Sequence, residues 1–167
     1  RVWAKKLICI GLLTLIASGC SSTSPRSSYY LLSGAKNITA VDLAETIEGG
    51  VILGVGPILL PEYTNRPQVV TRTNRNEITF SEFHRWAEPL INNFRWVFKE
   101  NLAMLVKTDD IFMYPWPKGM ALEYIITADV IRFDAVPEDS AILEVRWSLW
   151  RGNDRELLIN KKSSFQT

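Results

Sequence analysis

The feature that most limits the fold of this chain is a two-residue alternation in its last third. In residues 122–132 every second side chain is apolar and most of those between are polar; the apolar set is Leu122, Tyr124, Ile126, Ala128 and Val130. Residues 141–151 repeat the pattern, and residues 156–165 follow the turn-forming sequence at 152–154. Alternation with period two is typical of a strand with one buried and one wet face. The sequence therefore predicts an antiparallel meander of three strands.

A longer period begins at Pro89. Apolar side chains recur at three- and four-residue steps over about four turns, at Leu90, Phe94, Val97, Phe98, Leu102 and Leu105. Pro89 suits the first turn of a helix, because a proline lacks the N–H that is unpaired there. Such a stripe must be buried against a sheet. We therefore predict an α+β fold in which one long amphipathic helix packs on a mainly antiparallel sheet.

Shorter runs before the helix also have the character of strands. Residues 29–32 are aromatic and aliphatic, and residues 51–60 are rich in β-branched and other aliphatic side chains. Residues 68–72 and 77–80 flank a polar turn. These runs predict an opening strand, a largely buried strand and a hairpin.

The N-terminal segment has the pattern of a secretory leader. Arg1, Lys5 and Lys6 precede an apolar run over residues 7–16, which is well short of the roughly 20 residues of a membrane-spanning helix. The small residues after it run directly into Cys20, and this order resembles the lipobox of bacterial lipoproteins. The alternative is a conventional leader whose cysteine is incidental.

The lipobox resemblance divides the chain into three parts. It implies a signal peptide over residues 1–19, a lipidated Ser-rich tether over residues 20–28 and a single periplasmic domain over residues 29–167. Cys20 would carry a diacylglycerol and an N-acyl chain such as palmitate. Anchoring by several chains is stable, because each buried methylene contributes about 0.8 kcal/mol. Ser21 follows Cys20 in place of an aspartate, and by analogy with enterobacterial sorting this favours the outer membrane.

Composition argues against several functional classes. Loss of residues 1–19 removes three of the 19 basic residues, which leaves 16 against 18 acidic ones. A nearly neutral domain gives no electrostatic reason to expect a nucleic-acid partner. Cys9 leaves with the leader and Cys20 carries lipid, so no cysteine remains for a disulfide or a metal site. No G-x-G-x-x-G pattern is present to hold a phosphate.

The chain also offers little support for catalysis. His84 is the only histidine, and we expect it to be a hydrogen-bonded structural residue, although a serine–histidine–acid hydrolase stays open as an alternative. The acidic pairs Asp109-Asp110 and Glu138-Asp139 lie at expected loops, where we predict solvated turns. We therefore predict no enzyme, no catalytic residue, no metal site and no cofactor apart from the lipid on Cys20.

Three stretches carry a family resemblance in the order of the chain. They are residues 29–32 (YYLL), residues 60–63 with 66–72 (LPEY, RPQVVTR) and residues 85–90 (RWAEPL). Together they resemble the auxiliary lipoproteins of ABC-type intermembrane transport, the group that includes paraquat-inducible protein C. The resemblance runs from about Cys20 to the end of the chain. It implies helices packed on a mainly antiparallel sheet, with a final helix that this sequence lacks, so we expect a C-terminally incomplete domain with a bare sheet face.

The same resemblance implies a function. Such a lipoprotein is anchored to the inner leaflet of the outer membrane on its periplasmic face. There it docks or supports an ABC and mammalian-cell-entry-domain system that transports lipid and maintains the envelope. The alternative is a periplasmic lipid carrier that holds an acyl chain between helix and sheet. A ring or other homo-oligomer would suit a docking collar, and the sequence neither shows nor excludes it.

Four residues are candidates for partner contact. Tyr63, Arg66 and Pro67 lie in an expected loop over residues 61–67 (the motif loop), and loops with aromatic and arginine side chains are favoured interface material. The alternative is a packed tyrosine and an arginine paired with a local carboxylate. Trp150 falls on the otherwise polar face of its strand, where an apolar side chain can mark a contact with a partner or a lipid.

Overall fold

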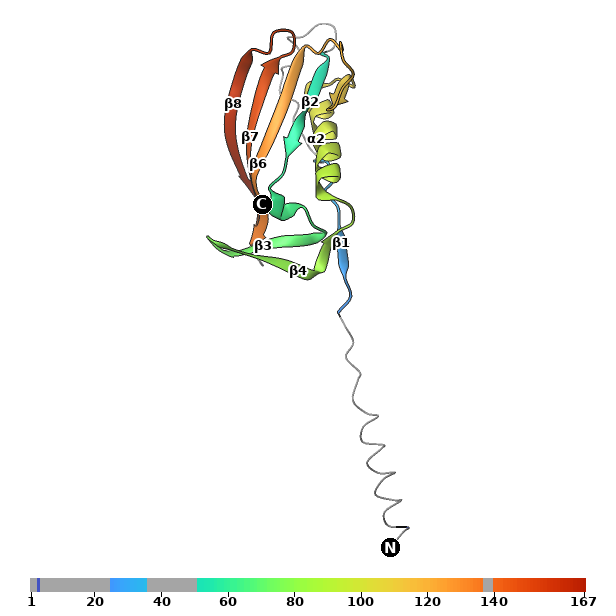
Figure 1. Ribbon diagram of the computed structural model, residues 1–167, viewed down its shortest axis with the longest axis vertical. Coiled ribbons are helices and arrows are strands. Elements are labelled where there is room, and N and C mark those ends of the chain that lie inside the picture. The colour runs from blue at the N-terminus through green and yellow to red at the C-terminus, as the bar shows by residue number, and fades with distance from the viewer. Residues whose placement is uncertain (1–2, 4–24, 36–50, 137–139) are drawn as a thin grey trace.

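The computed structural model describes Trp3 and residues 25–35, 51–136 and 140–167. Cys20, the rest of the expected leader and the pair Glu138-Asp139 lie outside the described residues. The elements, shown in Figure 1, are β1 (Ser28–Tyr30), β2 (Leu53–Leu59), the 3-10 helix η2 (Glu62–Thr64), β3 (Gln68–Asn74), β4 (Glu77–Trp86), α2 (Leu90–Val106), β5 (Ile111–Met113), β6 (Tyr124–Val136), β7 (Ser140–Arg151) and β8 (Leu157–Gln166).

The eight described strands belong to one mixed sheet. The predicted meander is present, because β6, β7 and β8 pair antiparallel along most of their lengths. On the other side of β6, β2 pairs in parallel with its first half and β3 meets its end through Thr71 and Ala135. The β3–β4 hairpin and β1 form a branch that turns away from the main sheet (Figure 1). The predicted α+β class is therefore confirmed.

Parallel pairing is the main difference from the expected sheet. β2 lies between β6 and β5 and is parallel to both. For β2 and β5 the reason is the connection through α2, which carries the chain back to the end of the sheet where β2 begins. Strands joined by such a helical crossover run in the same direction.

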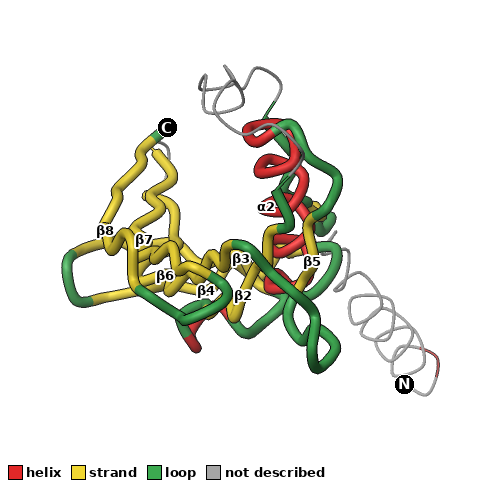
Figure 2. The backbone as a smooth tube through the Cα atoms, turned by 90° about the horizontal axis from the view of Figure 1, so that it is seen from above, coloured by secondary structure: helices red, strands yellow, loops and turns green. Residues whose placement is uncertain are grey.

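The core lies between α2 and the main sheet. α2 begins after Pro89 and ends at Lys107, whose φ of 54° is left-handed. Figure 2 shows α2 over the side of the sheet that holds β2 and β5, away from β8. The buried core cluster is made of Leu53, Val55, Ile58, Phe94, Ile111, Ala128, Val130 and Val145.

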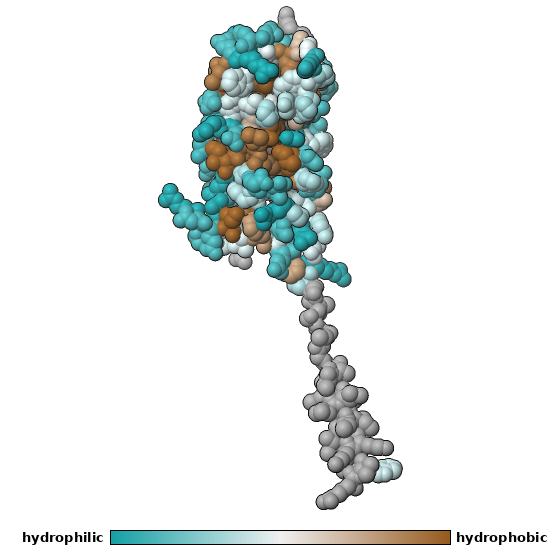
Figure 3. Space-filling view, viewed as in Figure 1, coloured by the Kyte–Doolittle hydropathy of each residue, from teal (hydrophilic) through white to brown (hydrophobic). Residues whose placement is uncertain are grey.

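Some apolar surface remains outside this core. On β8, Ile159 and Phe165 are 38% and 57% exposed. They share a face with Trp147 and Val145, the side of the sheet on which α2 packs. In the view of Figure 3, hydrophobic side chains also gather over the middle of the body. That the domain is C-terminally incomplete, with a sheet face left bare, stays a prediction.

Candidate partner-binding groove

A groove lies where the loop after β2 faces the start of α2. Its volume is about 590 Å³, and it is lined by residues 58–62, 64–67 and 86–91 together with Arg95. These segments include residues 60–62 and 66–67 of the second motif stretch and residues 86–90 of the third. Because the two stretches are separated in sequence by β3 and β4, only the fold brings them to the same place.

Tyr63 fixes the motif loop to β6 through two hydrogen bonds. Its phenol donates a hydrogen bond to Asp134 Oδ2 at 3.3 Å and accepts one from the backbone N–H of Phe133 at 3.0 Å. Burial raises the pKa of Tyr63, so the phenol stays a neutral donor. Tyr63 is therefore a packed, hydrogen-bonded residue that positions the loop.

Asp134 is the centre of a buried charge cluster. Arg72 on β3 donates from Nε and Nη2 to Oδ2 at 3.0 and 2.9 Å, and Arg132 donates from the same atoms to Oδ1 at 2.9 and 2.8 Å. Burial alone raises the pKa of the Asp134 carboxyl, but the hydrogen bonds from Arg132 and Arg72 outweigh it and hold the pKa below its ordinary value. The ionised carboxylate therefore joins the hairpin branch to the main sheet.

The two ends of the motif loop are held by further hydrogen bonds. Thr64 is 3% exposed, and its hydroxyl donates to the Pro61 carbonyl at 2.7 Å. The Trp86 N–H at the end of β4 donates to the Pro67 carbonyl at 2.7 Å. The Trp86 ring stacks on Phe133 with centroids 6.1 Å apart. The walls of the groove are therefore formed before any partner binds.

Arg66 and Pro67 are exposed and line the groove. The guanidinium carbon of Arg66 lies 3.7 Å from the centre of the Phe80 ring, a cation–π contact. This contact holds the arginine side chain against β4. Arg66 and Pro67 are thus the two candidates that the fold brings together with the third motif stretch, residues 85–90.

Trp150 lies elsewhere. It pairs with Ile125 near the start of β6 and is not among the residues that line the groove. Its indole N–H donates to Thr127 Oγ1 at 3.3 Å. The half-buried indole therefore packs against its own sheet, and its expected role as a partner contact stays a prediction.

Asp134 is the residue of the site that sequence reasoning missed. It lies in a strand with few other acidic side chains and belongs to none of the motif stretches. The one local signal was Arg132, two positions earlier and therefore on the same face of a regular strand. Arg72 and Tyr63 are 62 and 71 positions away, so their contacts with Asp134 depend on the whole fold.

The remaining polar candidates do not gather at the groove. His84 Nδ1 lies 2.7 Å from the Tyr30 hydroxyl on the exposed edge formed by β1 and β4. Asp109 and Asp110 are exposed between α2 and β5. Within the described ranges, no three histidine, cysteine, aspartate or glutamate side chains converge on a common point for a metal ion. In the same ranges, no helix has the length and apolarity to cross a membrane.

Comparisons with known proteins give a family and a fold. A family model described as the ABC-type transport auxiliary lipoprotein component matches residues 30–167. No curated protein matches the chain. A crystal structure described only as an uncharacterized protein has a TM-score of 0.66 and 18% identity, over 86% of this chain and 80% of that one. The structure of protein XCC0632 from Xanthomonas campestris has a TM-score of 0.66 and 14% identity, over 84% and 77%. At these identities the likeness is one of fold.

Proposed function

Because this chain belongs to the family of ABC-type transport auxiliary lipoprotein components, we propose that it docks an intermembrane lipid transport system at the outer membrane. Acyl chains on Cys20 hold the domain at the periplasmic face. The docked partner is a mammalian-cell-entry-domain protein of the transport system. The role is non-enzymatic, requires no metal or diffusible cofactor, and supports the integrity of the envelope.

The observation that carries this proposal is the groove between the two motif segments. Leu59, Leu60 and Ile91 give it apolar walls, and Arg66 also lines it. An apolar cleft with an arginine beside it is the arrangement that anchors a protein partner, because buried apolar contacts supply affinity and the arginine supplies direction. Its preformed walls also lower the entropy cost of binding.

The charges of the groove favour a protein segment over a strongly charged ligand. Glu62 and Glu88 line the groove together with Arg66 and Arg95, so acidic and basic side chains are balanced. Such a surface has no field of one sign to attract a polyanion. It fits a segment that inserts one apolar side chain and meets charges of both signs around it.

The test measures binding of the chain to the mammalian-cell-entry-domain protein of its own transport system. Leu59 lines the groove and is 56% exposed. Leu59→Glu should weaken binding at least about tenfold, because it would bury an unpaired carboxylate in the interface. The matched control is Leu157→Glu on β8, where Leu157 is 46% exposed and outside the groove. Equal affinities of the two variants would contradict the proposal.

One observation favours the lipid-carrier alternative. Ile159 and Phe165 leave an exposed apolar surface on the side of the sheet where α2 packs. An acyl chain could lie there, between the helix and the uncovered strands. Native mass spectrometry of the delipidated protein separates the two functions, because a carrier retains lipid in a fixed stoichiometry and a docking module does not.

A further inference from the structure

The end of the body nearest the N-terminus carries three consecutive large side chains that are exposed. Tyr29, Tyr30 and Leu31 are 64%, 43% and 60% exposed. They lie on or directly after β1, which pairs with β4 and with no other described strand. Figure 1 shows β1 at one end of the body. An exposed run of this kind on an edge strand marks a contact surface.

Chain length places this edge close to the anchor. Cys20 and Ser28 are eight residues apart, and a fully extended chain of that length spans at most about 29 Å. Once acyl chains hold Cys20 in a leaflet, β1 cannot move farther than this from the surface. The lipid surface is therefore the partner that β1 meets at the highest local concentration.

The chemistry of the edge fits the headgroup region of a membrane. Tyr29 and Leu31 have the same parity, so they point to one side of the strand, whereas Tyr30 bonds His84 on the other. Tyrosine prefers the boundary between apolar and wet surroundings, and a leucine adds apolar area below it. Arg26 is exposed just before β1, where its long side chain can reach lipid phosphates.

We propose that β1 is a membrane-contact edge, in which Tyr29 and Leu31 enter the headgroup region of the phospholipid leaflet. This inference rests on the proposed anchoring at Cys20. β1 is rigidly joined to the body, because the Ala87 N–H donates to the Tyr30 carbonyl at 2.9 Å. Contact through β1 therefore orients the whole domain on the membrane.

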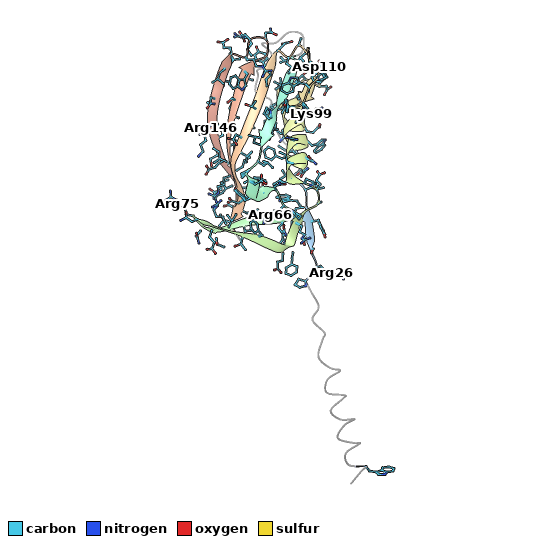
Figure 4. All side chains as sticks on the ribbon, viewed as in Figure 1. Arg26, Arg66, Arg75, Lys99, Asp110 and Arg146 are labelled. Carbon is cyan, nitrogen blue, oxygen red and sulfur yellow. The ribbon has the colours of Figure 1, made fainter. Side chains whose placement is uncertain are left out.

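The orientation has a consequence for docking. Tyr30 is the register partner of Trp86, and Trp86 lines the groove. The groove is therefore held near the leaflet. Figure 4 shows Arg26 and Asp110 at opposite ends of the body, so the Asp110 end points into the periplasm. A docked transport protein would meet the chain close to the membrane into which lipid is delivered or from which it is taken.

The test places a fluorophore on the full, lipidated chain at Ser28→Cys. The chain is reconstituted in vesicles of phosphatidylethanolamine and phosphatidylglycerol that contain a nitroxide-labelled phospholipid as quencher. We expect strong quenching at residue 28 and loss of most of it in the double variant Tyr29→Ser with Leu31→Ser. A label at Asp110→Cys should not be quenched. Circular dichroism confirms that the double variant keeps its fold, which is expected because both side chains are exposed.

Two results would overturn the inference. Quenching that is unchanged in the double variant would show that the tether alone brings residue 28 to the vesicle. Equal quenching at residues 28 and 110 would show that the body has no fixed orientation. Vesicle flotation distinguishes these failures from failure of the proposed function. A chain that does not float lacks the anchor, which defeats both proposals, whereas a floating chain with either quenching result defeats only this one.

Discussion

Tyr63 and Asp134 are 71 positions apart, yet their side chains meet, with the phenol oxygen 3.3 Å from Oδ2 of the carboxylate. The same carboxylate accepts hydrogen bonds from Arg72 on β3 and from Arg132 on β6. One buried charge therefore joins the motif loop, the hairpin branch and the main sheet. The shape of the groove depends on this cluster, although Asp134 does not line the groove itself.

Asp134→Asn should lower the free energy of unfolding by about 3 kcal/mol. The reason is that Arg72 and Arg132 would keep their charges in a buried site without the carboxylate that balances them. Urea unfolding at neutral pH measures the change. The control is Glu144→Gln, which breaks the more exposed pair with Lys162 at 2.8 Å and should cost less than about 1 kcal/mol. Similar losses in the two variants would contradict a structural role for the cluster.

The cluster should also make stability depend on acid. The pKa of Asp134 is lower in the folded chain than the unfolded value of about 3.9. The stabilisation that the ionised Asp134 carboxylate contributes is therefore fully present above the unfolded pKa, and it is lost as the pH falls through the folded pKa. We expect the unfolding free energy of the natural chain to fall more steeply below about pH 4 than that of Asp134→Asn. If the unfolding free energies of the two proteins, measured in urea, fall equally from neutral pH to pH 3, another group is responsible.

Two variants, Arg66→Ala and Tyr63→Phe, should distinguish a residue that contacts the transport partner from one that positions the motif loop. Arg66→Ala should weaken binding of the transport partner while lowering stability by less than about 1 kcal/mol, because its exposed contact with Phe80 is weak. Tyr63→Phe should lower stability by about 1 kcal/mol or more, because the Phe133 N–H loses its acceptor. Calorimetric binding and thermal unfolding measure the two effects. If Arg66→Ala binds normally, Arg66 is not a contact residue.

The sequence predicted the meander well because a sheet with one wet face imposes its period on the chain. β6, β7 and β8 were located for this reason. α2 begins after Pro89, where apolar side chains recur at three- and four-residue steps. β5 was not expected, because three residues are too few to show a period. The branch through Thr71 and Ala135 was also not expected, since a single bridge between distant strands leaves no local signal.

The sequence identified only some of the residues that form the groove, because burial is not visible in a loop sequence. Arg66 and Pro67 were chosen as candidates because they lie in a distinctive loop. The structure places both on the groove, and their role as partner contacts stays a prediction. Tyr63 lies in the same loop, but its side chain hydrogen-bonds to Asp134 and does not line the groove. Burial decides between these two outcomes, and burial depends on strands that are distant in the sequence.

Lipidation gives the most direct test of the anchor. Labelled palmitate should be incorporated into the natural chain and not into Cys20→Ala, because Cys20 is expected to be the one cysteine left after the leader is removed. The natural chain should fractionate with the outer membrane, and the variant should not. Cys9→Ala is the matched control and should keep its label. Equal labelling of the natural chain and Cys20→Ala would contradict anchoring at Cys20.

Asn93 should control how firmly the segment that follows β1, at Leu32, is joined to α2. This side chain on α2 is 5% exposed, its Oδ1 accepts from the Leu32 N–H at 2.5 Å and its Nδ2 donates to the Leu32 carbonyl at 3.3 Å. Asn93→Ala leaves both backbone groups without their partner, so we expect a loss of about 2 kcal/mol and faster hydrogen exchange at Leu32. The neighbouring Asn92 is exposed, and Asn92→Ala should neither lower stability nor speed exchange at Leu32, because alanine is favourable in a helix. Unchanged exchange at Leu32 in Asn93→Ala would show that other contacts hold this segment, whereas faster exchange would identify Asn93 as the contact that holds Leu32 against α2.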